Sequence, residues 1–82
     1  MFYRINNDNI VNLKDVSYVS IVQNEQSVWE LRIFMKQVEH YMFIQYDSKE
    51  NAVLAFELMA NELINLRQYR RVVRDEVENE NE

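Results

Sequence analysis

The 82-residue sequence contains no cysteine, no glycine, no proline and a single histidine, His40. Without cysteine the chain forms no disulfide or thiolate metal site, and one histidine excludes a site built from several imidazoles. Phosphate-binding loops, dinucleotide fingerprints and nucleophile elbows are also excluded, because each needs backbone conformations that glycine supplies. We therefore expect a protein that is not an enzyme and that holds neither a cofactor nor a metal.

Long apolar segments are absent as well. No run of 18 apolar residues exists, so no membrane-spanning helix is expected. The polar residues 6–9 interrupt any apolar core of a signal peptide, and we expect a cytoplasmic protein that does not associate with membranes. A chain of this length forms one small domain with marginal burial, which favours association with a second copy or another protein.

The net charge of −5 comes from the last eight residues. Residues 1–74 contain nine Lys or Arg and nine Asp or Glu side chains, and residues 75–82 add five acidic ones. We therefore divide the chain into one domain over 1–74 and an acidic tail over 75–82, which is expected to be disordered. Asparagine and aspartate are expected to replace glycine in turns, since they tolerate positive φ. This composition would suit a phage or mobile-element protein.

Hydrophobic periodicity predicts a strand-rich N-terminal half. Segment 10–13 would pair back on the first strand across a polar turn, and the third strand is rich in β-branched residues. In the last strand, Tyr41 and Phe43 face away from Met42 and Ile44. Short polar turns between successive strands predict a small antiparallel β-meander of about four strands. Segments 2–5, 16–22, 28–35 and 41–46 give these four strands, and 10–13 could add a further short one.

After residue 46 the apolar period changes to that of an α-helix. Asp47 is expected to be the N-cap, with Glu50 completing a capping box, and no helix breaker precedes Asp75. A helix over 48–74 would be about 40 Å long, about twice the length of a six-residue strand. The sequence thus predicts an α+β fold in which one long C-terminal α-helix packs on one sheet face and extends past it. The stripe that packs on the sheet is Ala52, Ala55, Phe56, Met59, Leu63 and Leu66.

Arginines gather in the part of the helix that is expected to pass beyond the sheet. Arg67, Arg70, Arg71 and Arg74 are spaced i, i+3, i+4 and i+7 and form one stripe, with Tyr69 among them. The stripe would bind an anionic partner such as nucleic acid, or it would only complement the helix dipole and pair with nearby acids. The acidic tail would then compete for the stripe or act as a solvated extension.

Two further surfaces are candidates for binding. The bulky residues Phe34, Tyr41 and Phe43 would make both sheet faces apolar, and they would stack nucleic-acid bases, contact a partner protein or complete the core. The outer side of the helix has heptad spacing with polar centres, which is typical of a dimer seam and equally of a solvated face. The residues of this possible seam are Leu54, Leu58, Asn61, Asn65 and Val72.

The order of elements resembles that of the transcriptional-coactivator and whirly type of single-stranded-DNA-binding fold. That fold implies a strongly basic strand face, whereas only Arg4, Arg32 and Lys36 lie on or beside strands here, and we assign no family. We expect a protein-interaction module, a small dimeric binder or inhibitor. The alternative is a single-stranded nucleic acid binding protein that uses the arginine stripe and the sheet aromatics. His40, beside Glu39, is expected to be solvated and not a general base.

Overall fold

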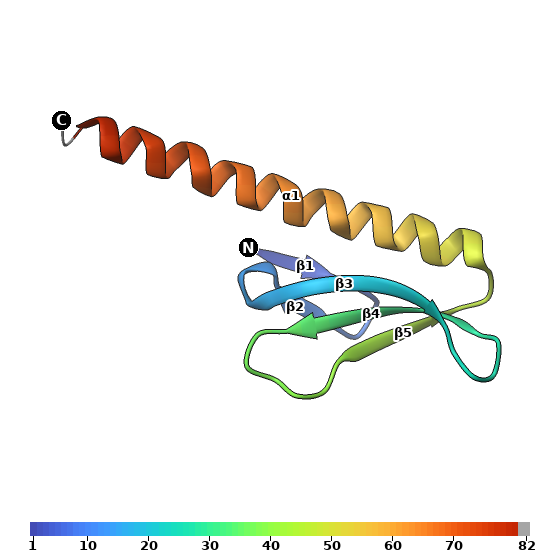
Figure 1. Cartoon of the computed structure of the whole chain (residues 1–82). Helices are drawn as coiled ribbons and strands as arrows, with labels where there is room; N and C mark the ends of the chain where they lie inside the picture. The colour runs from blue at the N-terminus through green and yellow to red at the C-terminus, as the bar shows by residue number, and fades with distance from the viewer. Residues whose placement is uncertain (81–82) are drawn as a thin grey trace.

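The computed structural model describes the backbone of residues 1–80 and the side chains of residues 1–66. In this part of the chain, two small antiparallel sheets precede one long helix (Figure 1). The predicted α+β class and element order are confirmed, with five strands in two sheets where the sequence suggested about four. The elements are β1 Phe2–Arg4, β2 Ile10–Asn12, the 3-10 helix Leu13–Asp15, β3 Val16–Gln23, β4 Trp29–Met35, β5 Met42–Tyr46 and α1 Lys49–Glu80.

The larger sheet has the strand order β3-β4-β5, so each strand pairs with its neighbour in sequence. The first two strands form a separate hairpin, in which Tyr3 pairs with Val11. This hairpin lies under the middle of α1, beside the larger sheet (Figure 1). The antiparallel arrangement follows from the short connections, which are too short for the crossover that parallel strands require.

Asparagine supports the turns through its side chain, not through its backbone conformation. The Asn6 Oδ1 atom accepts a hydrogen bond from the backbone N–H of Asp8 at 2.9 Å, and Asn24 Oδ1 accepts those of Gln26 and Val28. The residues with positive φ in the described chain are Ser27 at 65° and Gln37 at 62°. The expectation that asparagine supplies positive φ is therefore wrong, because its side chain closes the turns by hydrogen bonding instead.

The core lies between α1 and one face of the sheets. Ile33 at the centre of β4 and Met59 of α1 are completely buried there, and Tyr3 of the hairpin packs against the same cluster. The predicted helix stripe is confirmed, since its members are buried or partly buried. The other buried apolar residues are Val11, Leu13, Val16, Leu31, Ala52, Leu63 and Leu66.

The helix begins one residue later than the sequence suggested. Ser48, and not Asp47, is the N-cap: its Oγ atom accepts a hydrogen bond from the backbone N–H of Asn51 at 3.2 Å, and its carbonyl accepts that of Ala52. The Asp47 carboxylate instead accepts a hydrogen bond from the Asn51 side chain at 2.8 Å. The capping box with Glu50 is therefore wrong, because Asn51 occupies the third helical position after Ser48.

The helix continues to Glu80, beyond the predicted end at residue 74. No proline or glycine interrupts it, and arginine, glutamate and glutamine favour helix. It extends well past the sheets, as predicted (Figure 1), and the molecule measures 57 × 26 × 22 Å. The division into a domain over 1–74 and an acidic tail over 75–82 stays a prediction. Within the described residues, no helix combines the length and apolar character needed to cross a membrane.

Candidate functional site

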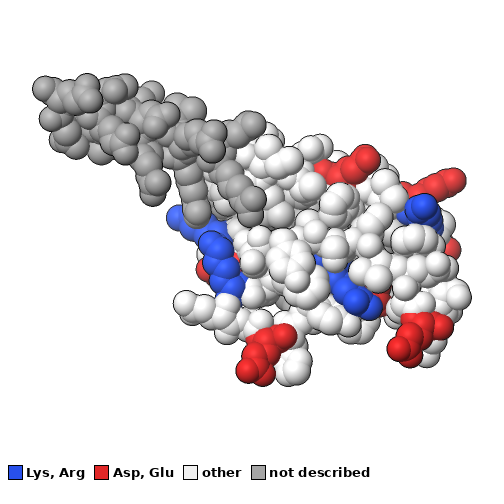
Figure 2. Space-filling view, in the orientation of Figure 1, with Lys and Arg blue, Asp and Glu red and all other residues white. Residues whose placement is uncertain are grey.

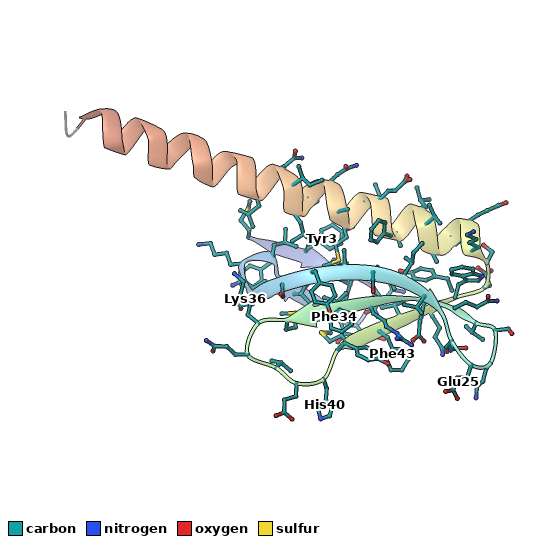
Figure 3. The ribbon with its side chains drawn as sticks, viewed as in Figure 1. Tyr3, Glu25, Phe34, Lys36, His40 and Phe43 are labelled. Carbon is teal, nitrogen blue, oxygen red and sulfur yellow. The ribbon has the colours of Figure 1, made fainter. Side chains whose placement is uncertain are left out.

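The face of the β3-β4-β5 sheet that points away from α1, here called the open face, carries four aromatic rings. Tyr18 is stacked on Phe34 with ring centroids 4.2 Å apart, Phe34 lies 5.2 Å from Tyr41, and Tyr41 lies 6.3 Å from Phe43. Figure 3 shows Phe34 and Phe43 on the side of the sheet opposite α1. Tyr18, Tyr41 and Phe43 are 54%, 39% and 56% exposed. The open face is thus a contiguous aromatic surface in contact with solvent.

Cross-strand register brings these rings together. Phe34 of β4 lies opposite Tyr18 of β3, and Phe43 of β5 lies opposite Arg32 of β4. Residues directly opposite one another in an antiparallel pair point to the same face, so aromatic side chains from three strands meet. The sequence predicted that Tyr41 and Phe43 share one side of the last strand, but it did not predict which sheet face the helix covers.

A β-bulge explains why sequence periodicity missed Tyr18. Val16 is buried in the core, and regular alternation would place Tyr18 on the same side. The register shifts between these two residues, so that Val16 pairs with Met35 and Tyr18 pairs with Phe34. The additional residue of the bulge reverses the alternation and directs Tyr18 to the open face. The alternation of apolar Val19 and Ile21 with Ser20 was the available signal in the sequence.

An ion pair fixes the polar part of the open face. Arg32 Nε donates a hydrogen bond to Glu30 Oε1 at 2.7 Å, and Asn24 Nδ2 donates one to Oε2 at 3.3 Å. Glu30 is only 4% exposed, and the Arg32 guanidinium lies 4.7 Å from the centre of the Tyr41 ring. Arg32 is therefore held in one position against an aromatic ring.

Electrostatics keep Glu30 ionised despite its burial. Burial raises the pKa of Glu30, but hydrogen bonds from Arg32 and Asn24, the positive charge of Arg32 and a hydrogen bond from Gln45 together outweigh it. The net pKa lies below the ordinary value of 4.5. At neutral pH both side chains of the pair are charged and their charges cancel. Arg32 therefore offers little free positive charge to a ligand.

A depression of about 360 Å³ lies beside the aromatic rings, at the end of the sheet nearest the β3–β4 loop. The loop contributes Asn24, Glu25 and Gln26 to its lining, and Glu25 is exposed at the tip (Figure 3). Carboxylate and amide oxygens make this depression suitable for a hydrogen-bond donor or a cation. The aromatic part of its lining is formed by Tyr41 and Phe43.

The described part of the chain is acidic. Residues 1–66 contain five Lys or Arg and nine Asp or Glu side chains, which leaves a net charge of −4. In the view of Figure 2 the charged side chains are scattered and form no large basic patch. The predicted arginine stripe, Arg67, Arg70, Arg71 and Arg74, and its neighbour Tyr69 lie outside the described side chains.

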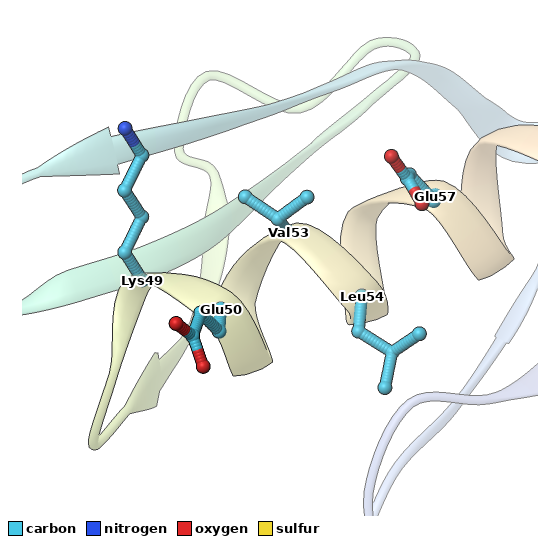
Figure 4. Close-up of a pocket in the computed structure, with 5 residues that line it drawn as sticks. All are labelled: Lys49, Glu50, Val53, Leu54 and Glu57. Atoms are coloured by element: carbon cyan, nitrogen blue, oxygen red, sulfur yellow. The ribbon is translucent and has the colours of Figure 1, made fainter.

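The outer side of α1 exposes isolated apolar side chains. Leu54 and Leu58 are 56% and 53% exposed, and Asn61 and Asn65 are exposed beside them, so the predicted dimer seam and its alternative, a solvated face, both stay predictions. Val72 lies outside the described side chains. A second depression of about 360 Å³ crosses the first helical turns, with Val53 and Leu54 between the charged side chains of Lys49, Glu50 and Glu57 (Figure 4). Charged and amide groups thus divide this surface into small apolar pieces.

His40 lies exposed in the loop between β4 and β5 and points away from the sheet (Figure 3). Within the described residues, no three histidine, aspartate or glutamate side chains are placed to hold a metal ion. The open face, where the aromatic rings and the Arg32–Glu30 ion pair lie together, is therefore the candidate functional site.

Comparisons with known proteins add no further identification. Neither the models of protein families, nor the curated proteins, nor the solved structures gave a significant match to this chain. Inferences about function therefore depend on the surfaces described above, and chiefly on the open face.

Proposed function

We propose that the protein is a non-enzymatic, cytoplasmic interaction module that binds another protein through the open face and acts as a homodimer. One observation carries the proposal: four adjacent aromatic rings with a fixed arginine lie on a sheet face that nothing in the described chain covers. Tyrosine and arginine are enriched among residues that dominate binding energy, and apolar patches with polar rims mark interaction sites. A single small domain rarely exposes such a cluster without a partner.

The charge of the domain defines the chemistry of the partner. The described residues carry a net charge of −4, and Arg32 is already neutralised by Glu30. A partner with an apolar centre and a basic rim is therefore complementary, because its cations would face Glu25 and the general negative field. Its apolar centre would cover Tyr41 and Phe43. An acidic partner surface would be repelled.

The substitution Phe43→Ser tests the proposal, with Leu58→Ser as the matched control. Both side chains are more than half exposed, but Leu58 lies on the outer side of α1. A partner is first captured from the source cells with wild-type protein, then purified and titrated by calorimetry against the wild type and both variants. We expect Phe43→Ser to weaken binding about tenfold or more, as for a central aromatic contact, and Leu58→Ser to leave it within about twofold.

The affinity should also fall with rising salt, because complementary charges accelerate association. Equal binding of a purified partner by the wild type and Phe43→Ser would contradict the proposal. So would a partner whose binding is lost only in Leu58→Ser, since the outer helix surface would then be the site.

Binding of single-stranded nucleic acid is the second candidate. The stacked Tyr18 and Phe34 rings and the exposed Phe43 favour it, because bases stack on exposed aromatic side chains of sheets. The net negative charge of residues 1–66 opposes it, since phosphates need free cations. Fluorescence anisotropy with an oligonucleotide at about 50 mM salt, where phosphate contacts are strong, decides between them. The assay uses a chain that lacks residues 75–82. If this chain binds the oligonucleotide and Phe43→Ser abolishes the binding, nucleic-acid binding replaces the protein-binding proposal. If this chain does not bind the oligonucleotide, nucleic-acid binding is removed as a candidate.

A further inference from the structure

β3 forms an open edge of the larger sheet and has no charged residue. It is the eight-residue strand Val16–Gln23, it pairs only with β4 in the described chain, and five of its residues are β-branched or aromatic. Natural edge strands are usually short or carry lysine or proline, which prevents pairing with another chain. β3 has neither lysine nor proline, although a bulge disturbs its first residues.

The bulge between Val16 and Tyr18 limits the regular part of this edge to residues 18–23. Beyond the bulge, each residue pairs in unbroken register with β4, from Tyr18 opposite Phe34 to Gln23 opposite Trp29. Backbone N–H and C=O groups on the outer side of this segment therefore have regular spacing and no strand partner in the described chain. Such a segment is a template for another extended strand.

We propose that two copies of the chain pair antiparallel along β3, with Ser20 of each copy at the two-fold axis. Three strands from each copy would form one continuous six-stranded sheet, in the order β5-β4-β3 followed by the same strands of the second copy in reverse. This inference deepens the homodimer part of the proposed function and rests on it.

Side-chain chemistry selects this register. With Ser20 opposite itself, Tyr18 lies opposite Val22 of the partner subunit on the open face, and Val19 lies opposite Ile21 of the partner subunit on the helix side. Aromatic–β-branched and β-branched–β-branched pairs are favourable across antiparallel strands. Because the edge has no charged residue, no like charges meet.

The alternative register with as many pairs places Ile21 at the two-fold axis. It opposes Val19 to the amide side chain of Gln23 of the partner subunit, and Ser20 to Val22 of the partner subunit. Both pairs match polar with apolar groups, so they are weaker than those of the register centred on Ser20.

The widths of the sheet and the helix are compatible with this arrangement. A three-stranded sheet is about 14 Å wide at about 4.8 Å per strand, whereas a helix with its side chains is about 10–12 Å wide. Since the two-fold axis is perpendicular to the sheet, both α1 helices would lie on the same side, each above its own strands. The two open faces would join on the other side, with Tyr18 of each copy next to the seam. Dimerisation would thus double the proposed partner-binding surface.

Other dimer geometries are less suited to the chain. β5 is the other sheet edge, but it has five residues and is followed at once by Asp47. The outer side of α1 exposes Leu54 and Leu58, which Glu57 and Asn61 separate from further apolar residues. Both geometries are outcomes that the experiment below would detect.

The substitution Ser20→Cys tests the register directly, because the natural chain has no cysteine. Opposite residues in antiparallel strands have Cα atoms about 4.5–5.5 Å apart, which lies within the range that a disulfide spans. We expect mild oxidation to give a covalent dimer on non-reducing gels. The matched controls Gln45→Cys on β5 and Leu58→Cys on α1 should remain monomeric on the same gels.

The substitution Ser20→Lys provides a second, independent readout. It places two like charges opposite each other at the axis, at a position that is half-buried in the single chain. Light scattering and sedimentation should show a wild-type dimer whose dissociation constant rises at least about tenfold in Ser20→Lys, and not in Gln45→Lys. Unchanged circular dichroism would show that the fold is intact.

Two results would overturn the inference in different ways. A wild-type chain that remains monomeric up to about 0.5 mM, where even millimolar affinity gives measurable association, would remove the homodimer altogether. A dimer in which Gln45→Cys or Leu58→Cys forms the disulfide instead would remove only the pairing along β3. In both cases, the effect of Phe43→Ser on partner affinity would still test separately whether the open face binds a partner.

Discussion

Replacement of Arg32 by methionine should destabilise the fold in a pH-dependent way. The substitution keeps most of the aliphatic volume but removes the group that donates to Glu30 at 2.7 Å. The Glu30 carboxylate, only 4% exposed, would retain contacts to amide groups alone. Removal of one partner of an ion pair lowers the free energy of unfolding by about 3–5 kcal/mol when the pair is fully buried. The loss is at most about 1 kcal/mol when the pair is exposed. Since the Arg32 side chain is 24% exposed, we expect the free energy of unfolding to fall by about 2 kcal/mol at pH 7.

The pH dependence follows from the pKa of Glu30. In the wild type this pKa lies below 4.5 in the folded state, so the pair stabilises the fold above pH 4.5 and the contribution is lost as the pH falls through the folded-state pKa. In Arg32→Met, burial is no longer outweighed by arginine, so the pKa of Glu30 rises. The variant then loses less stability on acidification, and the difference between the two proteins shrinks below about pH 4.5.

Urea unfolding at pH 7, 5.5, 4 and 3, followed by the fluorescence of the single tryptophan, Trp29, measures this difference. Lys36→Met removes an exposed cation at the end of the same sheet and should change stability little at any pH. The double variant Arg32→Met/Glu30→Gln should recover part of the lost stability, because no unpaired charge remains buried. A deficit of Arg32→Met that is constant from pH 7 to pH 3, or absent at pH 7, would refute the reasoning.

Two further predictions concern the core and the turns. Met59→Ala should lower the free energy of unfolding by about 2–5 kcal/mol in a denaturant titration, since Met59 is completely buried. Leu58 is exposed, so Leu58→Ala should lower the free energy of unfolding by less than about 1 kcal/mol. Equal losses in the two variants would contradict the described packing. Gln37→Gly should raise Tm by about 2–4 °C in thermal unfolding, because it relieves a positive φ of 62°. Gln26→Gly, at a position without positive φ, should lower Tm, and the opposite order would be inconsistent with the loop conformation.

Local periodicity in the sequence was sufficient to predict the main layers of the fold. Alternation in 41–46 separated Met42 and Ile44 from Tyr41 and Phe43, and in the structure the first two pack against the core while the other two are exposed. The helical stripe was predicted in the same way. These patterns are reliable because a strand or helix with one buried face must place its apolar residues at that element's own period.

The strand–helix junction and the polar part of the open face were harder to predict from the sequence. Asp47 and Ser48 are both good capping residues, and only the path of the chain after β5 selects Ser48. Glu30 lies on the open face, but its burial depends on Arg32 and on Asn24 from a turn six residues away. Sequence spacing does not show which long side chains will fold over one another.

The sequence by itself thus determined the α+β class, the long helix and the absence of glycine- or cysteine-dependent chemistry. Only the tertiary structure decided that a bulge directs Tyr18 to the open face, that this ring meets Phe34, Tyr41 and Phe43 there, and that β3 is an open edge. The physical reason is that periodicity reports the side to which a residue points, whereas register, bulges and lateral neighbours depend on pairing between segments distant in sequence.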